Sequence, residues 1–69
     1  SNSYVNNAVI AENFVDVFSE PRMENDKPLF RINEGTVVGV SNRQNNWFEI
    51  SLIDGKKGWV KDDTILVLK

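Results

Sequence analysis

The sequence contains no cysteine and no histidine. Without cysteine, the chain has no disulfide, no thiol nucleophile and no thiolate to bind structural zinc. Without histidine, it lacks the usual proton shuttle at physiological pH and the base of most nucleophilic triads. We therefore expect no cofactor, no bound metal and no catalytic residue. The lack of thiols does not fix the compartment, because a thiol-free chain is tolerated in the cytoplasm and the periplasm alike.

The sequence also lacks an excess of positive charge and a long apolar run. It has 8 basic and 10 acidic side chains, which give a net charge of −2 and a pI near 4.9. Nucleic acid is therefore not an expected partner. No apolar run approaches the roughly 18–20 residues that span a bilayer, so we expect no direct membrane insertion by this segment.

The chain is short, since 69 residues of 7.9 kDa are enough for one domain and no more. A domain of this size buries roughly 60% of the surface of its unfolded chain, which allows a tight core but no spare cavity for a large substrate. Ser1-Asn2 resembles the remnant of a cleaved tag, so we expect a piece excised from a longer protein. We predict a flexible lead over residues 1–6 and one folded domain over residues 7–69.

Apolar residues alternate with a period of two almost throughout, which predicts strands rather than helices. The predicted strand segments cover residues 8–11, 14–18, 29–32, 36–41, 47–53, 58–60 and 65–68. The first two are either separate strands or one strand broken near residues 12 and 13. Val15 and Val17 share one face of their strand. Phe14 and Phe18 then point outward, unless a bulge turns them into the core.

The segments between these strands carry turn signals. Residues 19–28 hold both prolines and five charges, which indicates a long loop because proline cannot donate to a sheet ladder. Asn33-Glu34-Gly35 and Asp54-Gly55 predict tight turns, the second being typical of a hairpin. Residues 42–46 are a polar loop, and residues 61–64 suit one turn of 3₁₀-helix.

This pattern predicts an all-β fold with about five or six short antiparallel strands and one long proline-bearing loop. Such a chain forms a small, strongly bent barrel or two orthogonal sheets. A three-stranded meander with disordered ends is the alternative. The alternation of apolar residues persists to Leu68, which favours the barrel.

Several segments, in order and with matching gaps, resemble the bacterial SH3-like (SH3b) domain. They are Ala8-Val9-Ile10-Ala11, Val15-Asp16-Val17-Phe18-Ser19-Glu20-Pro21, Leu29 through Glu34-Gly35-Thr36, Asn46-Trp47-Phe48 and Gly58-Trp59-Val60. The resemblance implies an SH3-like barrel with a long RT-type loop, often appended to other modules in envelope or cell-wall proteins. The acidic loop also makes the chain similar to the C-terminal SH3 domain of tetratricopeptide-containing aerotolerance proteins from Bacteroides-like bacteria.

The chain departs from related patterns at its candidate ligand positions. Phe18 and Glu20 stand where the family commonly has a basic residue and a glycine. Eukaryotic SH3 domains bind proline-rich peptides in a groove lined by aromatic residues. Of that groove the sequence keeps only Trp47, while Lys61 and Thr64 occupy the places of the proline and the tyrosine. Recognition of proline-rich peptides is therefore disfavoured.

Three aromatic residues are the candidate binding residues: Trp47, Trp59 and Phe18. By strand parity, Trp47 lies on the other face of its strand from Ile50, and Trp59 lies on the other face of its strand from Val60. Both tryptophans are therefore expected outside the main core. Together with Phe18 they form a candidate aromatic patch, the usual anchor for a peptide or sugar ligand. The alternative is that each ring covers a barrel end or packs beneath the long loop.

We interpret the chain as a non-catalytic binding or docking module of a larger bacterial envelope protein, on the periplasmic side. The expected partner is a protein or peptide. Two alternatives remain open: a structural clamp that packs on a neighbouring domain of its own chain, and a targeting module for peptidoglycan. A basic cluster of Lys56, Lys57 and Lys61 beside Trp59 is typical of a sheet edge protected against strand pairing.

Overall fold

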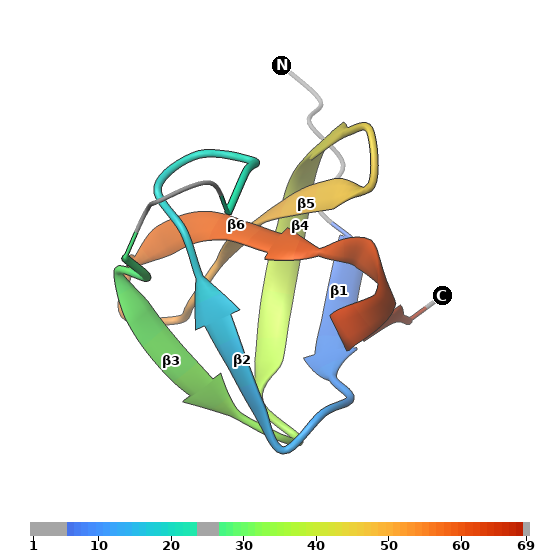
Figure 1. The fold of residues 1–69 in the computed structure, drawn as a ribbon. Coiled ribbons are helices and arrows are strands. Elements are labelled where there is room, and N and C mark those ends of the chain that lie inside the picture. The colour runs from blue at the N-terminus through green and yellow to red at the C-terminus, as the bar shows by residue number, and fades with distance from the viewer. Residues whose placement is uncertain (1–5, 24–26, 69) are drawn as a thin grey trace.

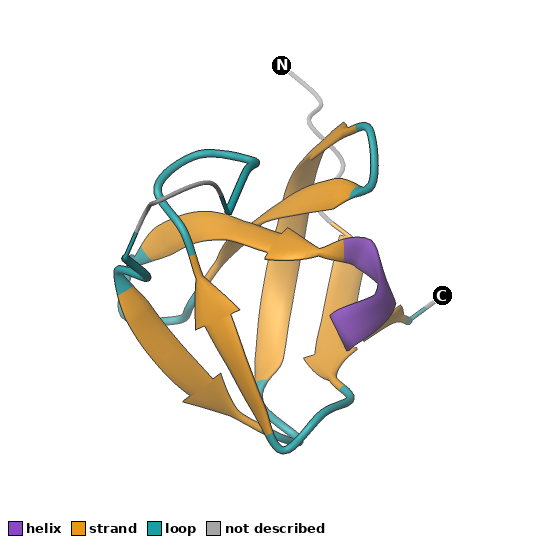
Figure 2. Ribbon diagram, viewed as in Figure 1, coloured by secondary structure: helices purple, strands orange, loops and turns teal. Residues whose placement is uncertain are grey.

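The computed structural model describes residues 6–23 and 27–68. Over these residues the chain forms seven strands and one 3₁₀ turn: β1 (Asn6–Ile10), β2 (Phe14–Val17), β3 (Phe30–Asn33), β4 (Val37–Gln44), β5 (Trp47–Ser51), β6 (Lys57–Lys61), η1 (Asp62–Thr64) and β7 (Ile65–Val67). A five-stranded antiparallel sheet has the order β6-β5-β4-β1-β7, and β2 and β3 form a second sheet (Figures 1 and 2). The all-β fold and the small SH3-like barrel are confirmed.

Apolar residues from both sheets fill the core between them. The buried core cluster consists of Ala8, Ile10, Val15, Val17, Ile32, Val38, Val40, Ile50, Val60 and Ile65. Most of these residues alternate along their strands with more exposed ones, as the period of two predicts. Val15 and Val17 lie in the core, and Phe14 points outward.

The N-terminal strand β1 lies inside the larger sheet, next to the edge strand β7. β1 pairs with β4 on one side and with β7 on the other, so Val9 lies opposite both Val37 and Leu66. The chain bends between β1 and β2, which confirms two separate strands there. β1 begins at Asn6, within the predicted lead, and residues 1–5 of that lead lie outside the described residues.

The predicted turns at the two glycines are present, but the polar loop is shorter than expected. Gly35 and Gly55 have φ values of +85° and +96°, a region that glycine enters without the steric cost of a Cβ atom. The prediction of a loop over residues 42–46 is wrong, because β4 continues to Gln44. A register shift between Val40 and Asn42 lets this polar end of β4 pair with β5.

The two sheets meet where β2 ends beside β6. The Phe18 N–H donates to the Trp59 carbonyl at 2.9 Å, and the Trp59 N–H donates to the Phe18 carbonyl at 2.7 Å. Gly58 allows this approach, because a Cβ at that position would overlap Cγ1 of Val17 and lie 2.9 Å from the Phe18 carbonyl. This bridge closes the barrel and places the long loop beside β5 and β6.

Candidate functional site

The structure brings the three predicted aromatic residues together. Phe18 follows β2, Trp47 begins β5 and Trp59 lies in β6. The rings of Phe18 and Trp47 are 5.9 Å apart at an interplanar angle of 89°, which is an edge-to-face contact. The main-chain bridge between Phe18 and Trp59 holds the third residue beside them. Phe18, which lies at least 29 positions before either tryptophan in the chain, thus joins them in one aromatic cluster.

Of the two interpretations of these aromatics, an exposed patch or rings that cover a barrel end or pack beneath the long loop, the second fits Phe18 and Trp47. Phe18 is 5% exposed and Trp47 is 7% exposed, while Trp59 is half-buried. Neither Phe18 nor Trp47 belongs to the main core cluster, so parity placed Trp47 outside that core as expected. Phe18 covers the indole from the start of the long loop, and the Lys61 ammonium lies 5.7 Å from the ring centroid on a neighbouring strand.

A surface hollow of about 220 Å³ lies beside this cluster, between β2, the long loop and η1. We call it the loop groove, and it is lined by Glu12, Phe14, Val15, Asp16, Phe18, Met23, Lys61 and Thr64. Two of its apolar residues are open to solvent: Phe14 is 61% exposed and Met23 is 56% exposed. Phe18 is therefore both the cover of Trp47 and part of the groove wall.

Cross-strand contacts hold the β2 side of the loop groove. Asp16 lies opposite Arg31 in the β2–β3 pair, and the Arg31 Nε donates to Asp16 Oδ1 at 2.9 Å. The same guanidinium lies 5.8 Å from the centre of the Phe14 ring. Arg31 thus connects a carboxylate and an aromatic ring of the groove. Because the ion pair is exposed, it orients these groups more than it stabilises the fold.

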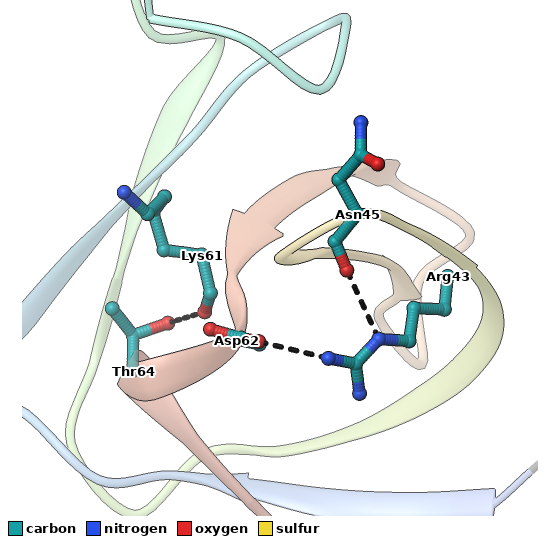
Figure 3. A network of polar contacts seen from close by, with 5 residues as sticks. All are labelled: Arg43, Asn45, Lys61, Asp62 and Thr64. Atoms are coloured by element: carbon teal, nitrogen blue, oxygen red, sulfur yellow. Dashed lines mark hydrogen bonds and ion pairs between the residues drawn. The ribbon is translucent and has the colours of Figure 1, made fainter.

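Polar contacts fix the η1 side of the loop groove (Figure 3). The Thr64 hydroxyl donates to the Lys61 carbonyl at 2.6 Å, within the turn that follows β6. Arg43 Nη2 donates to Asp62 Oδ2 at 3.1 Å, and Arg43 Nε donates to the Asn45 carbonyl at 3.0 Å. The turn between β4 and β5 is thereby joined to η1, which follows Lys61 directly.

Sequence reasoning did not select most of the residues that line the loop groove. Lys61 and Thr64 stand at the ligand positions of eukaryotic SH3 domains, but in the sequence they only disfavour proline-rich peptides and predict no groove. Phe14 was predicted to point outward, but nothing in the alternation indicated that it lies beside η1. Met23 is the strongly apolar residue of the long loop, but the sequence does not show which strand or turn it lies beside.

The residues that the structure describes contain neither a metal-binding cluster nor a membrane-spanning helix. Within residues 6–23 and 27–68, no three acidic, histidine or cysteine side chains come together as a group that could hold a metal ion. In the same part of the chain, no helix is long and apolar enough to cross a membrane.

Two packed antiparallel sheets, a long loop after the second strand and a 3₁₀ turn before the last one define an SH3-like barrel. The family model of the bacterial SH3 domain matches residues 11–65, so the chain belongs to that family. Among curated proteins, no sequence matches the chain. The family expected from the sequence is confirmed, and an aerotolerance protein as the parent stays a prediction.

Proposed function

We propose that the domain is a non-catalytic module that binds a segment of a protein or peptide in the loop groove. Domains of this family are binding modules. The observation that carries the proposal is the pair of exposed apolar side chains, Phe14 and Met23, which both line one concave site. Apolar side chains around a concave site with a few polar groups are the usual composition of a ligand pocket.

The candidate aromatics take different roles in this proposal. Phe18 forms part of the groove wall, and because it is 5% exposed it touches the bound segment only with the edge that lines the groove. Trp47 supports the edge of Phe18 and the stem of Lys61 from beneath. Trp59 holds Phe18 through the main chain and is itself half-buried. Trp47 and Trp59 therefore act mainly through Phe18, as positioning residues.

The chemistry of the groove favours an extended segment with an apolar side chain over a proline-rich helix. Lys61 supplies a cation and Glu12 a carboxylate, so the groove offers charges of both signs to residues that flank the apolar one. The stacked aromatic walls that accommodate polyproline II are not formed by the groove residues described here, because Lys61 and Thr64 replace the ring-bearing positions.

The test is selection of binders from a displayed library of random peptides, followed by mapping of amide chemical shifts with one selected peptide. We expect shifts at Phe14, Met23 and Lys61. A Phe14→Ser, Met23→Ser double variant should weaken binding by at least about tenfold, because it removes the apolar contacts. The matched control is Ile53→Ser, which alters an exposed apolar residue outside the groove. Selected peptides that bind the double variant as tightly as the unmodified domain would contradict the proposal.

A second candidate function is a clamp that packs on a neighbouring domain of the same protein. It is favoured by another hollow, of about 510 Å³, whose lining includes Val37, Gly39 and the fully exposed Ile53. Exposed apolar residues around a hollow are typical of a docking face. In a longer protein that includes the neighbouring domain, the amides of these residues should exchange more slowly with solvent. Unchanged exchange would exclude the clamp. Peptidoglycan binding and a periplasmic location stay predictions.

A further inference from the structure

β7 is an edge strand whose outer side faces no other strand in the described part of the chain. It is the last strand of the five-stranded sheet and pairs only with β1. The C-terminal end of the chain accordingly lies beside β1 at the side of the barrel (Figure 1). The opposite edge of the sheet is formed by β6, which is joined to the end of β2 through Phe18 and Trp59.

The hydrogen bonds to β1 show which main-chain groups of β7 point outward. The Ala11 N–H donates to the Thr64 carbonyl at 2.9 Å, and the Leu68 N–H donates to the Asn7 carbonyl at 2.7 Å. Thr64 and Leu68 thus direct main-chain groups toward β1, and in an antiparallel strand every second residue does so. Leu66, which lies between them, is therefore the residue of β7 whose N–H and C=O face β1. The N–H and C=O of the residues on either side of Leu66 therefore point away from β1.

Two of these outward groups suit pairing with another strand. The Ile65 N–H lies at the end of η1, where it closes the 3₁₀ turn. Three outward groups remain: the Ile65 carbonyl, the Val67 N–H and the Val67 carbonyl. The first two lie one on each side of Leu66 and are the pair that suits another strand. When an identical strand lies alongside in antiparallel orientation, the Val67 N–H of one strand faces the Ile65 carbonyl of the other, and the reverse.

The side chains of this edge strand are apolar, and none of its described residues carries a charge. Leu66, Val9 and Val37 lie directly opposite one another on β7, β1 and β4, and Leu66 is 62% exposed. The segment Ile65–Leu68 contains no charged residue or proline, which are the usual means of blocking an open edge. β6, at the other edge, carries Lys57 and Lys61.

We propose that a second copy of this chain pairs with β7 in antiparallel orientation about a two-fold axis at Leu66. The Val67 N–H of each copy donates to the Ile65 carbonyl of the other. The two Leu66 side chains then meet on one face at a non-hydrogen-bonded position, where cross-strand side chains are closest. The apolar row through Val9 and Val37 continues across the axis. A self-complementary contact of this kind closes as a dimer.

The test is sedimentation equilibrium of the 69-residue chain between about 20 µM and about 1 mM. The contact is small, so we expect a dissociation constant on the order of 0.1–1 mM. The mean mass should rise from that of the 7.9 kDa monomer toward twice that value. A mass that stays at the monomer value at the highest concentration would overturn the proposal. This holds even if β7 pairs with an extended segment of another protein.

A pair of variants at Val67 separates main-chain pairing from apolar adhesion. Val67→Pro removes the outward N–H without removing a hydrogen bond to β1, so association should weaken at least about tenfold while the fold is retained. Val67→Thr keeps the N–H and the branched Cβ, and association should stay within about threefold. Equal loss in both variants, or no loss in Val67→Pro, would overturn the proposal.

Amide exchange of the unmodified chain provides the measurement if Val67→Pro fails to fold. The Val67 amide should become protected as the concentration rises, because it is bonded only in the dimer. The Leu66 amide, bonded to β1 in each copy, should be protected at every concentration and is the internal reference. Exchange at Val67 that is independent of concentration would contradict the pairing.

Discussion

Gly58 shows how one residue sets the distance between the two sheets. Its missing side chain leaves room for Val17 and for the Phe18 carbonyl, and so for the bridge that closes the barrel. In the sequence Gly58 is part of an ordinary Gly-Trp-Val strand signal, and nothing in the alternation indicates which strand approaches it. The contact joins positions that are far apart in the chain, so it depends on the topology.

Gly58→Ala is expected to destabilise the domain by about 1–3 kcal/mol, the usual cost of overpacking a closely packed site. The added methyl group would displace Val17 or the main chain at Phe18. Urea denaturation of the purified domain measures this loss. Lys57→Ala is the control on the same strand, since an exposed side chain there should change stability by no more than about 0.5 kcal/mol. Equal stability of the two variants would contradict the argument.

Trp47 shows what strand parity predicts and what it leaves open. Parity identifies the face of β5 that carries Trp47, and the structure confirms that this face lies outside the main core. It does not identify what covers that face. The cover is Phe18, which comes from the start of the long loop 29 residues earlier. An outward face was therefore predictable, whereas exposure depended on a contact between distant segments.

Replacing Phe18 by arginine, the kind of residue common at this place in the family, should uncover Trp47. The edge-to-face contact is lost, and a charged guanidinium turns toward solvent because it cannot be buried without a partner at this position, where Phe18 is 5% exposed. In a Trp59→Phe background, quenching of Trp47 fluorescence by acrylamide should rise about twofold or more. Phe14→Arg in the same background is the control, because Phe14 is already exposed and should leave quenching unchanged. Unaltered quenching in Phe18→Arg would show that another segment covers Trp47.

At the level of elements, strands with apolar alternation and turns with glycine were predictable from local chemistry. The turn after β5 is an example, where the Lys56 N–H donates to Asp54 Oδ1 at 3.1 Å and Gly55 takes a positive φ. The end of β4 was not predictable, because residues 42–44 are all polar. They form a strand through pairing with β5 and through the bond from Asn42 Nδ2 to Glu49 Oε1 at 2.6 Å.

The connection between the β4–β5 turn and η1 can be measured with a double-mutant cycle of Arg43→Ala and Asp62→Ala. Their ion pair is 3.1 Å long, and Asp62 is only partly exposed. We expect a coupling energy of about 0.3–1 kcal/mol that decreases in high salt, because exposed ion pairs are screened. Urea denaturation at low and high salt provides the values. A coupling of zero at low salt would mean that the ion pair adds nothing to the main-chain contacts that join the turn to η1, such as the bond from the Asp62 N–H to the Asn46 carbonyl.

For the whole molecule, the fold class followed from composition and period, but the placement of function did not. The absence of histidine and cysteine favours a binding function over catalysis, and the family match agrees with a binding module. The site required the barrel to be closed, because the loop groove takes residues from before β2, from the long loop and from η1. Surfaces of this kind are assembled from distant segments, and local patterns do not specify them.

The loop groove and the β7 edge share no residue, so the two proposed contacts should be independent of one another. Thr64 lines the groove and directly precedes β7, so a shift of β7 on pairing could move a residue of the groove. We expect Val67→Pro to leave the affinity for a groove-binding peptide within about twofold, and the Phe14→Ser, Met23→Ser variant to associate as the unmodified chain does. Titration calorimetry and sedimentation equilibrium measure the two affinities. Coupling between two binding sites is reciprocal. If dimerisation changes the affinity for the peptide by some factor, peptide binding must change the dimerisation constant by the same factor. Such a paired change would show that η1 transmits the state of one surface to the other.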